Sequence, residues 1–321
     1  MITNYIKAKE IVKQKYNEND PYYPMLVVVL YGLLNKYQEH NLIKDLFLKT
    51  DIYIESGEIN EILKKHDIET EIEEDSLYTT YGGSNQGNLV YQDEKGNITF
   101  QKENPYIVCT NNVSNEDLLN TFCHELNHLI KGEINGFYFE ETENGMNYSL
   151  RTGLAVYYYE YKKEQDEIEY EVYNEYLDEA INSIQTTEII TDAYSLKDWI
   201  EDERIIQYLN SLEESKIKKD IGYHEITPIV RKIWNNKSFK ELIERNIVIG
   251  NLKEIEKEFD QNTFEGAFLK LAKYIDTIDK LIEINTRNKN LNKIQNKVQN
   301  IIDLYNSKTK FILQKKQNMI K

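Results

Sequence analysis

Residues 1 to about 75 have a helical pattern of hydrophobic and polar positions. The longest apolar run of the chain, Met25–Leu34, lies in this region and predicts a buried helix. Pro24 stands just before this run, where the start of a helix tolerates proline. A short strand is expected at Asp51–Glu55. The N-terminal part of the chain is therefore expected to be mainly helical.

Short apolar runs separated by Gly and Pro begin near Tyr78 and are typical of strands. Two of these runs flank the segment Glu94-Lys95-Gly96-Asn97, which has the glycine-containing turn expected of a hairpin. A further turn is expected at Glu143-Asn144-Gly145. The predicted strands are Leu89–Tyr91, Ile98–Phe100, Tyr106–Thr110, Phe137–Glu140 and Tyr148–Tyr161.

Helices are predicted between and after these strands. Ser114 and Asp117 form an S-x-x-D capping box, so a helix is expected from this point to Gly132. A long amphipathic helix is expected over about Asp166–Ile190, and the chain after Tyr194 has a helical pattern to its end. Gly and Pro are concentrated in the first half of the chain, which is therefore expected to hold the strands.

Composition and charge narrow the classes of function. The chain has 321 residues, 40% of them hydrophobic, which is enough for one large or two modest cores. A formal charge of -16 argues against nucleic acid or an anionic membrane as a partner. Two cysteines cannot form a disulfide framework, Met1–Lys15 has no secretory pattern, and no apolar run is long enough to span a bilayer. We therefore expect a cytoplasmic protein.

The last segment of the chain has the opposite charge. Residues 285–321 contain nine Lys and Arg and one acid, Asp303, so their net charge is about +8 and that of the remainder is about -24. Apolar residues recur at helical spacing from Leu291 to Tyr305. We expect a basic amphipathic helix that packs on the acidic body; contact with nucleic acid or a membrane is the alternative.

Residues His124 to His128, in the order His-Glu-Leu-Asn-His, form an H-E-x-x-H pattern. Two imidazoles four residues apart on a helix project from one side, where both nitrogens reach one Zn²⁺ at about 2.0–2.1 Å. Glu125 is placed to take a proton from the attacking water. At about 100° per residue, an apolar stripe that includes Phe122 and Leu126 lies opposite His124. This helix is therefore expected to present the motif to a cleft; the alternative is a pair of surface histidines.

A catalytic zinc ion requires a third protein ligand and leaves its fourth position open. The residue six positions after His128 is Ile134, so no third histidine occurs at that spacing. Our candidate is Glu179, which shares a helical face with the small polar residues Asn182 and Ser183. Either residue is suited to hold a metal ligand in place. A solvated carboxylate is the alternative for Glu179, and the reserve ligands are Asp178, Glu188 and Asp192.

The H-E-x-x-H pattern, followed on a later helix by Glu179 within Asp178–Ser183, resembles the gluzincin group of zinc metallopeptidases over about Leu89 to Tyr194. The resemblance implies a zincin-like core with His124, His128 and Glu179 as zinc ligands and Glu125 as general base. It also implies a strand antiparallel to the bound peptide, for which Tyr106–Thr110 is the candidate. Ser183 departs from the pattern, because thermolysin-type members have an aspartate at this position.

The remaining candidate residues carry weaker signals. A hydrogen-bond donor to the developing oxyanion should be a tyrosine or a histidine, and Tyr194, Tyr173 and His224 are the candidates. His224 is alternatively a surface histidine. Cys123 is interpreted as a buried reduced thiol because no C-x-x-C accompanies it. The residues interpreted as structural are His40, His66 and Arg151, the last with pairing to an acid near the site as its alternative.

These patterns predict an α+β protein with a helical region over residues 1–75, a zincin-like core over residues 76–195 and a helical lobe over residues 196–321. The predicted function is Zn²⁺-dependent hydrolysis of a peptide bond in a peptide or protein substrate. One alternative is a zinc-binding protein that holds a peptide in the same cleft without cleaving it. The other is a helical structural protein in which the motif is coincidental. The intact Glu125 favours the enzyme.

Overall fold

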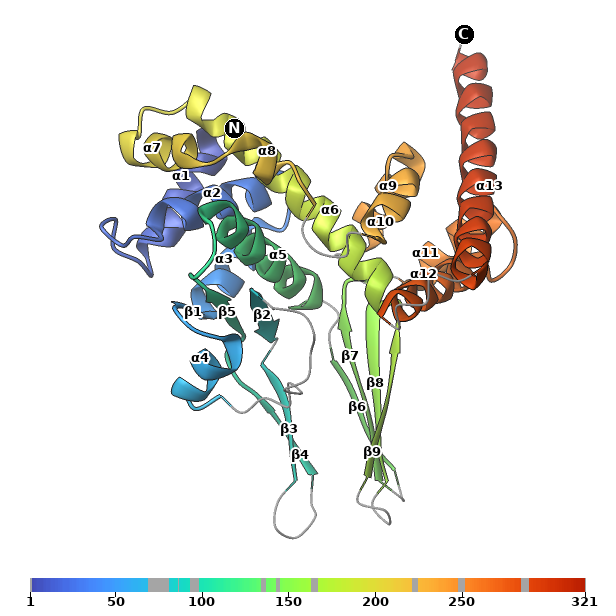
Figure 1. The fold of residues 1–321 in the computed structure, drawn as a ribbon, viewed down its shortest axis with the longest axis horizontal. Coiled ribbons are helices and arrows are strands. Elements are labelled where there is room, and N and C mark those ends of the chain that lie inside the picture. Colours follow the sequence, from blue (N-terminus) through green and yellow to red (C-terminus); the bar gives the residue numbers. More distant parts are fainter. Residues whose placement is uncertain are drawn as a thin grey trace. The chain divides into compact units, whose positions relative to one another are not determined.

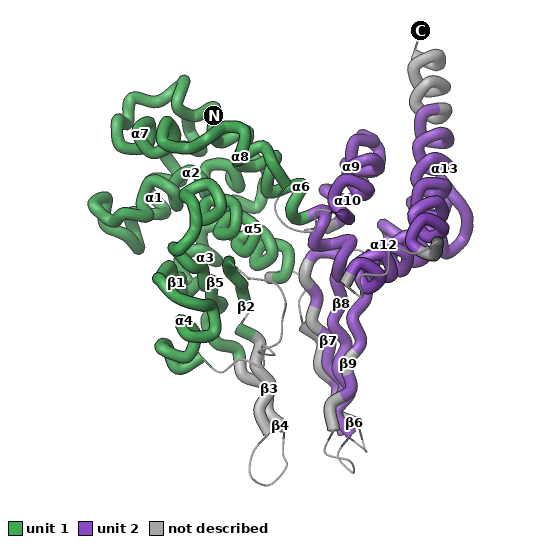
Figure 2. The backbone as a smooth tube through the Cα atoms, viewed as in Figure 1, with its two compact units in different colours: residues 1–133, 182–221 green, residues 134–181, 222–321 purple. Residues whose placement is uncertain are grey.

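The computed structural model has a mixed α+β architecture, which confirms the predicted fold class (Figure 1). The chain divides into two compact units (Figure 2). Unit 1 comprises Met1–Glu133 and Asn182–Ile221, and unit 2 comprises Ile134–Ile181 and Gly222–Lys321. The structure describes residues 2–68, 81–85, 87–92, 98–133, 137–142, 145–162, 167–220, 225–247, 252–283 and 289–320.

Unit 1 is built around one apolar helix. Helix α2 (Tyr23–Lys36) is buried from Tyr23 to Leu34, so the apolar run at Met25–Leu34 forms the buried helix that was predicted. The other helices of this unit are α1 (Ile2–Lys13), α3 (His40–Lys49), α4 (Ile59–Lys65), α5 (Asn115–Glu133), the later part of α6 (Glu175–Tyr194), the 3₁₀ turn η1 (Ser195–Asp198), α7 (Glu203–Ser211) and α8 (Glu214–Ile217).

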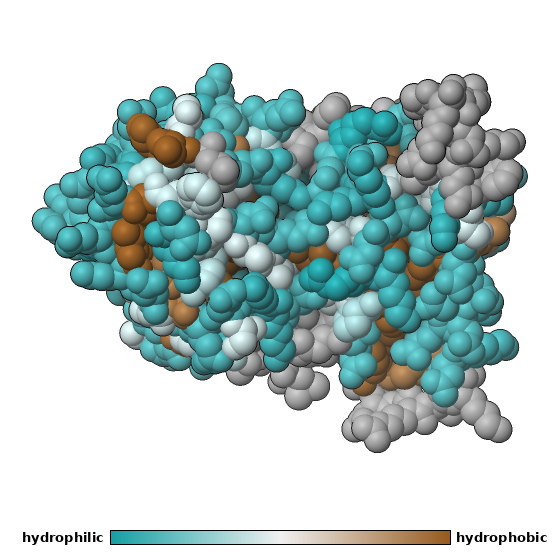
Figure 3. Space-filling view, turned by 90° about the horizontal axis from the view of Figure 1, so that it is seen from above, coloured by the Kyte–Doolittle hydropathy of each residue, from teal (hydrophilic) through white to brown (hydrophobic). Residues whose placement is uncertain are grey.

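The face drawn in Figure 3 is mainly hydrophilic, with separate hydrophobic spots. Among the described residues, no helix combines the length and the apolar character needed to cross a membrane.

A three-stranded sheet in unit 1 has the order β1–β5–β2, with β1 at Asp51–Glu55, β5 at Tyr106–Thr110 and β2 at Gly82–Asn85. The central strand β5 pairs parallel with β1 and antiparallel with β2. Strands β3 (Asn88–Gln92) and β4 (Ile98–Lys102) pair as the predicted hairpin, whose turn lies outside the described residues. Gly82 lets β2 lie close to α5, since a Cβ atom there would be 2.5 Å from Thr121 Cγ2.

Unit 2 contains a four-stranded antiparallel meander in the order β6–β7–β8–β9, with bounds Phe137–Thr142, Gly145–Thr152, Ala155–Lys162 and Glu167–Tyr173. The helix predicted from about Asp166 is wrong in its first part, because Glu167–Tyr173 is strand β9 and α6 begins at Glu175. This stretch alternates glutamate with Ile168, Tyr170 and Val172, the period-two pattern of a strand with one apolar face. The same residues also fit a helical pattern, and their pairing with β8 decides in favour of the strand.

The C-terminal helices complete unit 2. They are α9 (Thr227–Trp234), α10 (Lys237–Ile247), α11 (Leu252–Gln261), α12 (Ala267–Glu283) and α13 (Lys289–Ile320). Phe259 stacks on Tyr305 with ring centroids 4.6 Å apart, and Phe239 meets both rings edge-on. Helix α13 buries Val298 and Ile301 beside Tyr305, so the basic helix packs into the core of this unit through its apolar face.

The three regions expected from the sequence stay a prediction, and the two compact units divide the chain at other positions. The expected core, residues 76–195, is divided between the units, because β6–β9 and the start of α6 cluster with the C-terminal helices. Helix α6 is continuous through this division, since unit 2 ends at Ile181 and unit 1 resumes at Asn182 within the same helix.

Candidate metal centre

Helix α5 presents the H-E-x-x-H residues on one face and buries the other. Ser114 Oγ accepts a hydrogen bond from the backbone N–H of Asp117, which is the predicted N-terminal cap. Leu119, Phe122 and Leu126 are fully buried, whereas His124 and Glu125 are partly exposed. The apolar face predicted from the sequence therefore packs into the core, and His124 and Glu125 lie on the side away from it.

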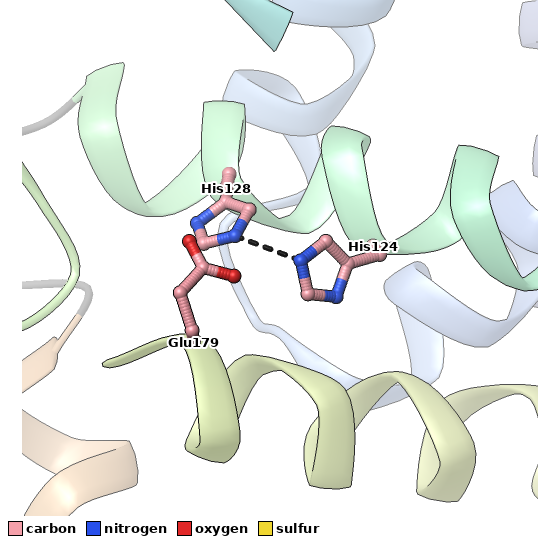
Figure 4. A group of neighbouring side chains, drawn as sticks. All are labelled: His124, His128 and Glu179. Atoms are coloured by element: carbon pink, nitrogen blue, oxygen red, sulfur yellow. Dashed lines mark hydrogen bonds between the residues drawn. The ribbon is translucent and has the colours of Figure 1, made fainter. Parts of the chain in front are cut away.

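The two imidazoles converge on one point (Figure 4). The Nε2 atoms of His124 and His128 lie 3.0 Å apart, and their rings are inclined by 76°. Two nitrogens bound to one tetrahedral Zn²⁺ at about 2.0–2.1 Å lie about 3.3 Å apart, so the observed separation is close to that of a shared ion.

Glu179 completes a group of three ligand-type side chains. One ligand atom from each of His124, His128 and Glu179 lies within 4.8 Å of the others. Glu179 comes from α6, and Asn182, one turn later on that helix, donates a hydrogen bond from Nδ2 to the backbone carbonyl of His124 at 3.0 Å. The third ligand predicted from the sequence therefore lies with the two histidines.

The reserve carboxylates occupy other positions. Asp178 is buried and accepts a hydrogen bond from the backbone N–H of Leu154, at the turn between β7 and β8. A Cβ on Gly153, which has a φ of +58°, would be 2.2 Å from Asp178 Oδ1, so this close approach requires glycine. Glu188 pairs with Lys36 at 3.3 Å, and Asp192 is exposed near the end of α6.

Ser84 is a residue of this site that the sequence did not indicate. Its Oγ donates a hydrogen bond of 2.8 Å to Glu125 Oε2. Ser84 lies on β2, far from Glu125 in the chain, and the close approach of β2 to α5 at Gly82 brings the two together. No local pattern marks a serine that is positioned by a pairing of distant strands.

The strand expected to lie along a bound peptide is paired on both of its edges. Tyr106–Thr110 is β5, which is hydrogen-bonded to β1 on one side and β2 on the other, so it has no edge for a further strand. Within the part of the chain that the structure describes, the edge strand of this sheet on the side of Glu125 is β2.

The tyrosines expected as oxyanion donors lie elsewhere. Tyr194 is on the same helix as Glu179 but fifteen residues later, which is about 22 Å along the axis. Tyr173 is 48% exposed at the end of β9, where its hydroxyl bonds to Glu171. His224 lies outside the described residues.

A different tyrosine lies at the N-terminal end of α6. The hydroxyl of Tyr157, on β8, is 3.5 Å from Glu175 Oε1. Burial raises the pKa of Tyr157 well above its usual range, and the charges of Glu175 and Glu179 raise it further. Tyr157 therefore stays a protonated hydrogen-bond donor at neutral pH.

Both cysteines are buried thiols of low reactivity. Burial raises the pKa of the Cys123 thiol, and burial together with the charge of Glu125 raises that of Cys109. Both are free and fully buried, so the interpretation of Cys123 as a buried reduced thiol is confirmed.

The residues interpreted as structural make local contacts. His40 Nε2 is 2.7 Å from the carbonyl of Leu34, and His66 Nε2 is 2.7 Å from Glu55. Arg151 Nε donates to the carbonyl of Gly153 at 2.8 Å, beside the turn that Asp178 holds.

Carboxylates gather near the start of α6. Burial raises the pKa of Glu175 to about 6, and the charges of Glu179 and Asp276 add to the rise. Burial also raises the pKa of Asp276, on α12, to about 6, and Asp279 adds to it whereas Lys280 opposes it. At neutral pH this end of α6 carries closely spaced negative charges, which favour a cation.

We expect Glu175→Gln to stabilise the metal-free protein by about 1–2 kcal/mol at pH 8. A carboxyl whose pKa is higher in the folded chain is destabilising when ionised, above about pH 6, and this effect fades as the pH falls toward its ordinary pKa of 4.5. Urea unfolding at pH 8 and pH 4.5 measures the difference. The exposed Glu265→Gln is the control; equal stabilisation by Glu175→Gln at both pH values would contradict the prediction.

No protein-family model, curated protein or solved structure with which the chain was compared matches it. The geometry of the site therefore carries the functional argument.

Proposed function

We propose that this chain is a zinc-dependent peptidase in which His124, His128 and Glu179 hold the metal and Glu125 acts as general base. The observation that carries the proposal is the convergence of the three ligand-type side chains from α5 and α6. Helix α5 orients the histidines, and the continuous α6 brings Glu179 to them.

The donor set favours zinc with an open position. Two imidazoles and one carboxylate are a frequent ligand set of catalytic zinc, which keeps its fourth position for water or substrate. Structural zinc sites more often use four protein ligands, usually with cysteine. Both cysteines of this chain are buried thiols with raised pKa, which suits them poorly as ligands.

The side chains around this group have complementary roles. A bound zinc ion supplies Lewis-acid polarisation of a carbonyl group and lowers the pKa of water toward neutrality. Glu125 takes the proton from the attacking water and returns it to the leaving amine. Ser84 donates to the Oε2 atom of Glu125 and thereby orients the carboxylate.

The peptide is proposed to bind along β2. This strand is antiparallel to β5 and carries Ser84 beside Glu125, so a peptide paired with its outer edge passes close to the general base. Such a strand accords with the resemblance to gluzincins. Tyr157 is proposed as the oxyanion donor, since its hydroxyl lies 3.5 Å from Glu175 Oε1, one turn before Glu179 on α6, and burial together with the charge of Glu179 raises its pKa.

Metal analysis together with a cleavage assay tests the proposal. We expect the purified chain to bind one zinc ion per molecule at neutral pH and to cleave casein. A chelator should stop the cleavage, and added zinc should restore it. Absence of stoichiometric zinc would contradict the metal site, whereas zinc without cleavage of casein or a peptide library would favour a zinc protein that binds peptides without cutting them.

A further inference from the structure

Three buried side chains link helices α5 and α6 beside the proposed metal ligands. Tyr37, the residue directly after α2, donates from its hydroxyl to Asn127 Oδ1 at 2.6 Å. Asn127 Nδ2 donates to Asn182 Oδ1 at 2.7 Å, and Asn182 Nδ2 donates to the backbone carbonyl of His124 at 3.0 Å. All of these residues belong to unit 1.

We propose that the hydrogen-bonded series Tyr37–Asn127–Asn182 fixes the register of α6 on α5. It thereby holds Glu179 at the two histidines before a metal ion binds. This inference rests on the proposed function, because it assigns Glu179 as a ligand.

The direction of these three hydrogen bonds is set by the backbone carbonyl of His124, at which the series ends. A backbone carbonyl only accepts, so Asn182 must turn its Nδ2 toward His124 and its Oδ1 toward Asn127. Asn127 must then present its Nδ2 to Asn182 and its Oδ1 to the hydroxyl of Tyr37. Each group has one consistent orientation, and aligned hydrogen bonds of this kind strengthen one another.

Burial makes the arrangement specific. Asn127 and Asn182 have no exposed surface, and Tyr37 is 6% exposed. A buried amide that loses its partner costs about 1–3 kcal/mol, so a shifted packing of α6 on α5 that breaks these bonds is disfavoured. Apolar side chains of similar size would fill the same space without penalising such a shift.

Neighbouring polar side chains on α6 do not supply this restraint. Ser183 and Thr186 are buried on the same helix, but within the described residues their hydroxyl oxygens have no hydrogen-bond partner. Asn182, by contrast, reaches α5 with both ends of its amide.

The position of this restraint suits a metal site. Asn182 lies one turn after Glu179 and bonds to the carbonyl of His124, a proposed ligand on the facing helix. A slide of α6 by one turn would move Glu179 by about 5.4 Å, far more than zinc coordination tolerates. The same three side chains therefore link the packing of the helices to the geometry of the ligands.

Zinc affinity of variants, measured by competition with a chelating dye, tests the inference. We expect Asn182→Ala to weaken zinc binding by about 10- to 100-fold, the range for removing a hydrogen-bond partner that orients a metal ligand. Tyr37→Phe, which removes one hydroxyl, should weaken binding by a smaller factor. Thr186→Val is the matched control, because Thr186 is a buried polar residue of α6 that takes no part in the hydrogen-bonded series. This substitution should leave the zinc affinity unchanged.

Thermal unfolding of the metal-free variants separates positioning from stability. A variant that remains folded at the assay temperature keeps its zinc affinity if its only defect is lower stability. Wild-type affinity in folded Asn182→Ala would overturn the inference and leave the proposed function intact. If Asn182→Ala does not fold, wild-type affinity in Tyr37→Phe has the same meaning. A wild-type chain that fails to bind zinc would instead contradict the proposed function.

Discussion

Replacing Glu125 by glutamine is expected to reduce peptide hydrolysis strongly while one zinc ion per chain stays bound. Glutamine keeps the length of the side chain and an oxygen that accepts the hydrogen bond from Ser84, but it cannot take a proton from water. Positioned general bases contribute about 10²- to 10⁴-fold to rates, so kcat should fall by a factor in this range. Casein cleavage and metal analysis on the same sample measure both quantities.

The matched control is Glu10→Gln, the same substitution at an exposed position of α1. It should leave both zinc content and cleavage at wild-type values. Unchanged cleavage by Glu125→Gln would refute the role of Glu125 as base. Loss of zinc from this variant would show instead that Glu125 helps to hold the metal, which the proposed ligand set does not include.

The sequence predicted the helix start, the helix face and the strand bounds that depend on residues close together in the chain. The cap at Ser114 and the apolar stripe through Phe122 and Leu126 fixed both the start of α5 and the face that carries the motif. Tyr106–Thr110 forms a strand with the predicted bounds. Glu179 could be proposed as the third ligand because its helical face and its small neighbours follow from sequence spacing, and the structure places it near the two histidines.

Features that depend on distant pairing were not predictable in this way. Strand β9 has acids at every second position, which a helical wheel also accommodates, and only its pairing with β8 decides between the two. The order of the sheet, which makes β2 rather than β5 the edge, depends on a pairing between distant segments. Ser84 reaches Glu125, and Tyr157 reaches Glu175, through such pairings, so no spacing along the chain marks either residue.

Glu179→Gln is expected to weaken zinc binding by more than the about 10- to 100-fold that removal of a ligand's hydrogen-bond partner costs. The substitution leaves a neutral amide where zinc prefers a carboxylate, imidazole or thiolate, and only His124 and His128 remain as strong ligands. Zinc competition at neutral pH, followed by casein cleavage at a fixed free zinc concentration, measures the loss of affinity and its consequence.

Glu175→Gln is the matched control for this prediction, because it is the same substitution one turn earlier on the same helix. It removes a nearby negative charge without removing a ligand, so zinc affinity should fall by no more than about fivefold, the factor equivalent to about 1 kcal/mol of charge interaction. Equal effects of the two substitutions would show that α6 attracts the metal only through its charge, and would exclude Glu179 as a ligand. A large loss confined to Glu179→Gln would support direct coordination, since both variants lose the same formal charge.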